Sequence, residues 1–198
     1  MGNPLNKIDI DQLCNFYDVE TYVETGTGEG NSLAVILEIK SINKLYTVDI
    51  DPSMLSQASN RLGCEDKVKY VCNNSFDFLK ELLENDLKDK DSVLFFLDAH
   101  FPFADFKKMT YQESIDFYKN QAVPLKDELE LISKHRLNKN DIIILDDLRI
   151  YKDGPYEGGN WNDRSLYKLG DESFIYQFFP DRTITEYYTE QGFILITP

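Results

Sequence analysis

A short β-branched run that leads into three glycines at alternate positions constrains this chain more than any other feature. The segment, residues 22–32, is Tyr-Val-Glu-Thr-Gly-Thr-Gly-Glu-Gly-Asn-Ser, with its glycines at Gly26, Gly28 and Gly30. Glycine lets the backbone adopt positive φ and approach a ligand closely, and a helix that starts near Ser32 would direct free N–H groups at that ligand. The spacing differs from the dinucleotide fingerprint G-x-G-x-x-G. With Glu24 two residues before the first glycine, it favours a ligand that carries positive charge over a pyrophosphate.

Strand-like and helix-like segments alternate along the chain in a βαβαβ order. We expect strands at residues 21–24, 45–48, 68–72, 93–97 and 142–145, and helices at 32–42, 52–62, 76–84 and 124–136. The second helix has Asp51 as its N-cap and stops at Gly63, and Ser75 is the expected N-cap of the third. Residues 183–188 and 193–197 flank Glu-Gln-Gly and predict a closing β-hairpin. The pattern predicts an α/β fold on a mostly parallel sheet.

The length fits one domain over residues 1–198, preceded by a polar N-terminal segment at 1–20. Two long segments, 101–123 and 152–170, interrupt the alternation. The first is rich in aromatic residues, and the second is glycine-rich and contains Trp161, the one tryptophan of the sequence. Long loops of this kind often cover a binding site, so we expect insertions or lids there.

Charge and hydropathy exclude several classes of partner. The chain carries 21 basic and 35 acidic residues, a net charge of −14, which repels phosphate backbones and anionic lipid. Its longest apolar runs are far below the roughly 20 residues of a membrane span, and no basic-then-apolar leader opens the sequence. We therefore expect a cytoplasmic protein without nucleic-acid or membrane partners. Cys14, Cys64 and Cys72 have no metal-type spacing and are expected to be free thiols.

Acidic residues end four of the five expected parallel strands. They are Glu24, Asp49, Asp98 and the pair Asp146 and Asp147. Ligands of an open parallel sheet bind beyond the carboxyl ends of its strands. Adjacent strands lie about 4.8 Å apart, and two carboxylates at that range repel by roughly 3 kcal/mol at an effective dielectric of 20. The last three acids therefore need a cation or a shared proton, and they suit Mg²⁺ or Ca²⁺ better than zinc. Independent helix caps are the alternative explanation.

His100 follows Asp98 by two residues, at the rim of the expected site. Neutral imidazole takes up a proton near pH 7, so His100 is a candidate base, with Asp98 as its catalytic neighbour. A structural histidine is equally compatible with the sequence.

These motifs resemble those of the class I S-adenosylmethionine-dependent methyltransferases over residues 20–198. The resemblance implies one doubly wound, Rossmann-like domain whose seven-stranded, mostly parallel sheet has the order 3-2-1-4-5-7-6, with helices on both faces. It also implies a cofactor site for S-adenosylmethionine: Glu24 would face the methionyl ammonium, Asp49 the ribose hydroxyls, and Ile50, Ser75 and Phe76 the adenine. The remaining residues of that implied site are Thr25, Gly26, Gly28, Gly30, Ser32 and Asp98.

A narrower resemblance is to metal-dependent O-methyltransferases, of both the catechol type and the type that modifies sugars of natural products. It places Mg²⁺ between Asp98, Asp146 and Asp147. The sugar-modifying type has an aspartate as base where this chain has His100, and the catechol type has a lysine where this chain has Phe101. The departure at Phe101 disfavours catechols.

The leading hypothesis is O-methylation of a small, sugar-like or polyhydroxylated acceptor, with His100 as the base. One alternative is a metal-dependent glycosyltransferase that uses Asp49-Ile50-Asp51 as a D-x-D site. Another is a non-catalytic binding module on a methyltransferase fold. The acceptor and the oligomeric state, a homodimer among the options, stay open.

Overall fold

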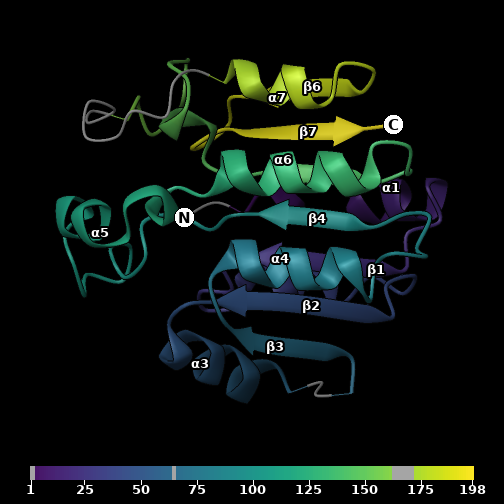
Figure 1. Cartoon of the computed structure of the whole chain (residues 1–198), viewed down its shortest axis with the longest axis horizontal. Coiled ribbons are helices and arrows are strands. Elements are labelled where there is room, and N and C mark those ends of the chain that lie inside the picture. Colours follow the sequence, from purple (N-terminus) through teal and green to yellow (C-terminus); the bar gives the residue numbers. More distant parts are fainter. Residues whose placement is uncertain (1–2, 64–65, 162–171) are drawn as a thin grey trace.

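A computed structural model describes residues 3–63, 66–161 and 172–198 (Figure 1). It contains a seven-stranded sheet of order β3-β2-β1-β4-β5-β7-β6, in which β7 runs antiparallel to both of its neighbours. The expected fold class and strand order are confirmed. The described helices are all too short or too polar to cross a lipid bilayer.

The strands of the sheet are β1 (Thr21–Thr25), β2 (Lys44–Asp49), β3 (Val68–Cys72), β4 (Leu94–Leu97), β5 (Ile142–Leu145), β6 (Thr183–Tyr187) and β7 (Phe193–Thr197). The α-helices are α1 (Ile10–Phe16), α2 (Asn31–Ile36), α3 (Pro52–Leu62), α4 (Ser75–Glu84), α5 (Tyr111–Tyr118), α6 (Leu125–Arg136) and α7 (Ser173–Phe178). Three short 3₁₀ segments complete the described elements: η1 (Pro4–Asn6), η2 (Lys119–Ala122) and η3 (Leu148–Ile150).

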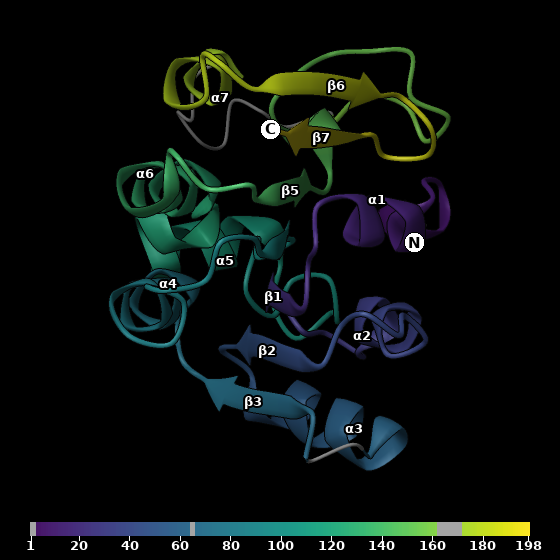
Figure 2. The same cartoon turned by 90° about the vertical axis from the view of Figure 1, so that its right-hand side faces the viewer.

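Alternation along the central strands builds a core on each face of the sheet. Val23 and Phe95 point into one cluster with the inner faces of α4, α6 and α7. Tyr22 and Phe96 point into the other with α1 and α2. Successive side chains of a strand face opposite sides, so a strand covered on both faces is apolar throughout. Figure 2 shows the two helical layers, with α1, α2 and α3 on one side of the sheet and α4, α6 and α7 on the other.

Two local expectations were wrong. Helix α2 ends at Ile36 instead of residue 42, because the chain must turn back for Asn43 N to reach Glu20 O at 2.9 Å and start β2. Asn74, not Ser75, caps α4, since its side chain accepts from Asp77 N at 2.9 Å. The polar N-terminal segment also contains α1, which Asp9 caps and which packs against the sheet through Ile10.

The aromatic segment after β4 holds a helix that sequence periodicity alone did not predict. Helix α5 begins with a capping box in which Thr110 and Glu113 bond each other's backbone N–H groups. Figure 1 shows α5 beyond the end of the sheet toward which β2 and β4 point. The segment therefore lies at the carboxyl edge, where ligands of parallel sheets bind. Of the expected loop at 152–170, residues 162–170 lie outside the described part of the chain.

A buried ion pair at the amino edge of the parallel strands joins the end of α6 to the segments that precede β4 and β5. Arg136, at the end of α6, bonds both oxygens of Asp141 at 2.7 Å and also donates to the carbonyls of Leu87 and Lys90. Asp141 in turn accepts from Val93 N at 2.9 Å. The Arg136 side chain is 2% exposed, so its charge depends on these partners.

We predict that Arg136→Met lowers the free energy of unfolding by about 3–5 kcal/mol, because the buried Asp141 carboxylate would lose its paired cation and keep only the Val93 N–H and the charge of Arg182 nearby. Urea denaturation measures this difference. Lys134→Met is the matched control, since Lys134 is an exposed neighbour paired with Glu130 on the same helix, and we expect a change below about 1 kcal/mol. Equal losses in the two variants would contradict the prediction.

Candidate active site

A cavity of about 410 Å³ opens at the carboxyl edge of the parallel strands. This volume lies in the range of roughly 300–1,000 Å³ typical of small-molecule sites. Eleven of the expected site residues line it: Gly26, Gly28, Ser32, Asp49, Ile50, Ser75, Phe76, Asp98, His100, Asp146 and Asp147. Three others, Glu24, Thr25 and Gly30, are buried and do not line it.

The glycine loop forms one side of this cavity, and its backbone demands glycine. Gly26 has φ +86°, and a Cβ there would lie 2.8 Å from the carbonyl oxygen of Asp98. Gly30 has φ +74° and precedes α2, where a Cβ would press on Ala58 at 3.0 Å. L-residues with side chains rarely adopt this conformation. The glycines therefore let the loop pack closely against the end of β4 and against α3.

Asp49, at the end of β2, is oriented by two backbone N–H groups. Gly28 N donates to its Oδ2 at 2.9 Å, and Asp51 N donates to its Oδ1 at 2.8 Å. Each carboxylate oxygen offers two lone pairs, so one on each oxygen stays available. Burial raises the pKa of Asp49 above its ordinary value. The geometry presents two hydrogen-bond acceptors to the cavity.

Glu24 lies beneath the glycine loop instead of in the cavity. It is fully buried and accepts hydrogen bonds from the hydroxyls of Tyr22 at 3.1 Å, Thr47 at 2.7 Å and Ser32. Burial raises its pKa to about 7 in spite of these donors. Ser32, whose hydroxyl donates to Glu24, does line the cavity.

A second buried carboxyl, Glu128 of α6, lies on the other face of the sheet. Its Oε2 is 3.4 Å from Thr25 Oγ1, and its Oε1 has no hydrogen-bond partner among the described residues. Burial raises its pKa to about 7.

The structure brings His100 into the middle of the acidic cluster. Its Nε2 lies 3.1 Å from Asp147 Oδ2 and 3.2 Å from Asp105 Oδ2, and its Nδ1 lies 3.6 Å from Asp98 Oδ1. Although burial opposes a charged imidazole, the hydrogen bonds to Asp105 and Asp147 raise the pKa of His100 well above its usual value. Asp98, His100 and Asp147 each offer a ligand atom within 4.8 Å of the others, the spacing of a metal site.

Asp146 lies beside this trio and is not one of its members. Its Oδ1 accepts from Asp147 N at 2.8 Å. Burial and the neighbouring Asp147 carboxylate raise the pKa of Asp146 to about 8. Burial and then Asp146 also raise the pKa of Asp98. Crowded carboxylates of this kind are stabilised by a proton, an imidazolium or a metal cation.

Residues that sequence reasoning missed hold this cluster in place. Asp105 accepts from the Tyr111 hydroxyl at 2.9 Å while it faces His100. Arg149 and Gln191 approach Asp147 from the far side. Asp105 falls in the aromatic segment after β4, where its neighbours gave no periodic signal, and Gln191 lies far along the sequence in a hairpin turn.

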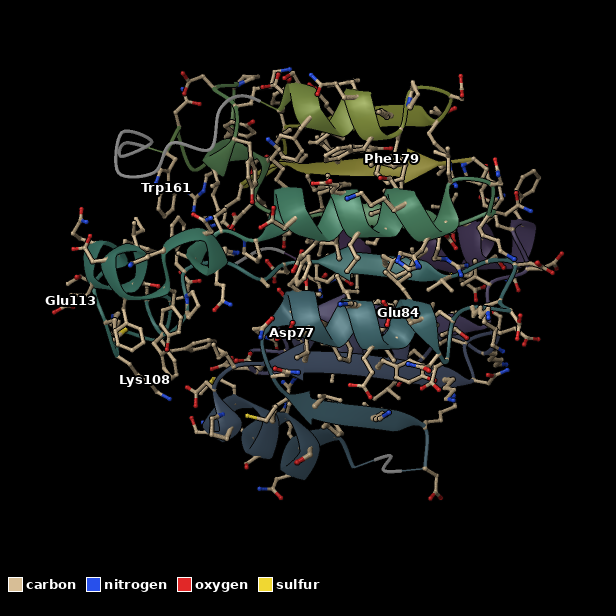
Figure 3. The ribbon with its side chains drawn as sticks, viewed as in Figure 1. Asp77, Glu84, Lys108, Glu113, Trp161 and Phe179 are labelled. Carbon is tan, nitrogen blue, oxygen red and sulfur yellow. The ribbon has the colours of Figure 1, made fainter. Side chains whose placement is uncertain are left out.

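Two peripheral contacts bring flanking segments over the cavity. Lys108 donates to Ser53 Oγ at 2.7 Å and contacts the Asp51 carboxylate, which attaches the 101–110 segment to α3. Lys7 pairs with Glu190 at 2.8 Å near the N-terminal segment, whose Asn3 lines the cavity. Figure 3 shows Lys108 and Trp161 at the same end of the molecule, apart from Glu84 on α4.

A second hollow of about 850 Å³ lies at the opposite, amino edge of the strands. Its walls include exposed charged residues such as Asp89, Asp91 and Lys134, and it contains none of the glycine loop or the acidic cluster. The chemistry of the residues at the carboxyl edge therefore favours the smaller cavity as the candidate active site.

Comparison with known proteins places the fold. No family model matches the sequence, and no curated protein matches it. Among solved structures, an O-methyltransferase from Bacillus cereus in complex with SAH has a TM-score of 0.58 at 14% identity, over 100% of this chain and 83% of that one. TomG from Streptomyces achromogenes, an O-methyltransferase involved in tomaymycin synthesis and solved with SAM, has a TM-score of 0.56 at 17% identity, over 100% and 80%.

An rRNA methylase from Streptococcus thermophilus also matches, with a TM-score of 0.53 at 16% identity over 100% of this chain and 97% of that one. At these identities the likeness establishes the fold alone, which this chain shares with these methyltransferases. Proteins named for rRNA and for tomaymycin synthesis share it, so the fold does not by itself define the acceptor.

We predict that Glu128→Gln stabilises the protein above pH 7 and has little effect at pH 5. The pKa of Glu128 is about 7 in the folded protein and ordinarily 4.5, so the unfolded state binds fewer protons between these pH values and stability falls as pH rises. The gain at pH 8 is of the order of 3 kcal/mol. Urea denaturation at both pH values measures it. Glu84→Gln, at an exposed position of α4, is the control, and a pH-independent effect of Glu128→Gln would contradict the prediction.

Proposed function

We propose that this chain transfers a methyl group from S-adenosylmethionine to a hydroxyl of a small, sugar-like or polyhydroxylated acceptor, with a bound Mg²⁺ and with His100 as general base. The observation that carries the proposal is one cavity lined by both the glycine loop with Asp49 and the cluster of Asp98, His100 and Asp147. The first group suits a nucleoside with a charged tail, and the second suits acid–base chemistry beside it.

The cofactor end of the cavity fits S-adenosylmethionine. Asp49 has a free lone pair on each oxygen for two ribose hydroxyls, and Ile50, Ser75 and Phe76 line the wall where the adenine would lie. When bound, this cofactor supplies an electrophilic methyl group on a positively charged sulfur. Asp98 and Ser32 would meet the methionyl end directly. Glu24 would act on that charge through Ser32, because hydroxyl donors already occupy its oxygens.

The acidic cluster fits a hard divalent cation. Asp98, Asp146 and Asp147 would hold it. Burial and, after it, the neighbouring carboxylates raise the pKa values of Asp98 and Asp146, and a bound cation would offset both effects. When bound, Mg²⁺ would act as a Lewis acid toward the acceptor hydroxyl. His100 Nε2 lies 3.1 Å from Asp147 Oδ2 and contributes a neutralising contact to this carboxylate.

In its neutral form, His100 would take the acceptor proton through Nδ1. Its Nε2 is engaged by Asp105 and Asp147, which fixes that nitrogen as the donor. Its Nδ1 is 3.6 Å from Asp98, beyond hydrogen-bond distance, and the side chain is 11% exposed at the cavity wall. An acceptor hydroxyl between Nδ1 and the methyl donor would be deprotonated as it is methylated.

The cavity combines polar groups with aromatic rings. Asp105, Gln121 and Gln191 line it together with Phe103 and Phe106. Hydroxyl-rich compounds need hydrogen-bond partners at several points and stack well on ring faces. The net charge of −14 supports an uncharged or cationic acceptor over a nucleic acid.

The two alternatives are less well supported. A D-x-D site would need Asp49 and Asp51 free for a shared metal, but Asp51 caps α3 through Ser53 and is paired with Lys108. A non-catalytic module would have no need for a histidine held between three carboxylates. Cofactor binding without methyl transfer to any acceptor would favour the module.

We predict that isothermal titration calorimetry detects S-adenosylhomocysteine binding and that Asp49→Ala weakens it at least tenfold, through loss of two charge-assisted hydrogen bonds. Asp89→Ala, at the opposite edge of the sheet, is expected to bind like the wild type. Absence of binding by the wild-type chain would reject the cofactor assignment.

Methyl transfer to a panel of glycosides, followed with a tritiated methyl group, tests the chemistry. We predict that His100→Ala lowers the turnover number by about 10²–10⁴ without changing S-adenosylhomocysteine affinity, as expected for loss of a general base. Excess chelator is expected to abolish transfer. Undiminished turnover in His100→Ala would exclude the base, full activity with chelator would exclude the cation, and transfer to catechol alone would exclude the sugar-like acceptor.

A further inference from the structure

The turn between β6 and β7 reaches the acidic cluster from the far edge of the sheet. Leu148 N donates to Gly192 O at 2.9 Å, and Arg149 N donates to Gln191 O at 3.1 Å. These two backbone bonds join the turn to η3, the short helix that follows Asp147. The β6–β7 hairpin turn, although remote in sequence from β5, is therefore held beside the residues that follow β5.

Gln191 uses this position to contact Asp147. With its amide oriented to satisfy both neighbours, the nitrogen donates to Asp147 Oδ1 at 2.9 Å and the oxygen accepts from the Arg149 guanidinium. The other oxygen of the same carboxylate, Oδ2, faces His100 Nε2 at 3.1 Å. Gln191 therefore holds one oxygen of Asp147 and leaves the other directed into the cluster.

Arg149 fixes the orientation of that amide. Its side chain is 17% exposed, its Nε lies 3.7 Å from Asp147 Oδ1, and its guanidinium carbon lies 5.3 Å from the centroid of the Trp161 ring. A stacked guanidinium is a rigid donor. Without the Arg149 guanidinium, the Gln191 amide could rotate and turn its oxygen toward the Asp147 carboxylate. The two oxygens would then repel each other.

The backbone at Asp147 makes such support necessary. Asp147 has φ +51°, in the left-handed region that residues with side chains seldom occupy. Strain of this kind persists where surrounding contacts fix it, and it is common at functional sites. The direction of this carboxylate is thus set by its neighbours.

We propose that Gln191 and Arg149 are positioning residues for Asp147, so that the β6–β7 turn forms part of the divalent-cation site. The inference rests on the proposed function, because it assumes that Asp147 is a cation ligand. Residues that orient a metal ligand typically change metal affinity by about 10–100-fold when they are removed.

Direct Mn²⁺ binding to the full chain, without acceptor, tests this inference, with Mn²⁺ as a paramagnetic probe of the Mg²⁺ site. Electron paramagnetic resonance of free Mn²⁺ gives the affinity. We expect Gln191→Ala to bind Mn²⁺ about tenfold or more weakly. Arg149→Lys keeps the positive charge but loses the planar guanidinium with its paired donors. A several-fold lower Mn²⁺ affinity in this variant would therefore assign the effect to geometry and not to charge. Gln112→Ala is the matched control, because Gln112 bonds Asp116 at 2.7 Å on the exposed face of α5.

Calorimetry with S-adenosylhomocysteine in metal-free buffer separates the outcomes. Unchanged affinity for this compound in Gln191→Ala and Arg149→Lys, with weakened Mn²⁺ binding, supports the inference and shows that both variants are folded. Wild-type Mn²⁺ affinity in both variants overturns the inference and leaves the proposed function standing. A wild-type chain that binds S-adenosylhomocysteine and no Mn²⁺ overturns both the cation site and the inference. A wild-type chain that binds neither compound overturns the proposed function as a whole.

Discussion

Mutual repulsion among the carboxylates that follow β4 and β5 is the constraint around which the rest of the site is organised. Parallel pairing places Leu97 beside Leu145, so the acids that follow these residues must share one small volume. Each surrounding feature compensates for that charge. His100 contributes a proton-binding ring, Arg149 contributes a fixed positive charge, and backbone N–H groups contribute partial charges. The same compensation defines where a metal ion would bind.

The end of the cavity proposed for the nucleoside is built on a different principle. There the glycine loop removes side chains so that the backbone itself forms the surface, and Asp49 is held by N–H groups of that backbone. Glu24, the acid that precedes the glycine loop in sequence, does not line the cavity, and the hydroxyls of Tyr22 and Thr47 donate hydrogen bonds to it. Its hydrogen bonds connect β1 with β2 through Thr47 and with the start of α2 through Ser32, and they thereby stabilise the conformation of the glycine loop.

Sequence reasoning predicted the sheet and most of its elements because their signals are local. Alternating and continuous apolar runs define the strands, and Asp51 and Gly63 define the limits of α3. It failed where long-range contacts decide the boundary. Helix α2 is shorter than expected because the chain must turn back to pair Asn43 N with Glu20 O before β2. The buried face of α1 becomes apparent only from its contacts with the sheet.

The sequence by itself determined the fold class, the glycine loop and the set of acids at the strand ends, because each depends on residues close together in the chain. Only the tertiary structure decided which of these side chains meet. It placed His100 rather than Asp146 in the closest group with Asp98 and Asp147, and it added Asp105 from a loop and Gln191 from a distant turn. The physical reason is that a site at a sheet edge is assembled by strand pairing and loop closure, whose partners have no fixed spacing in sequence.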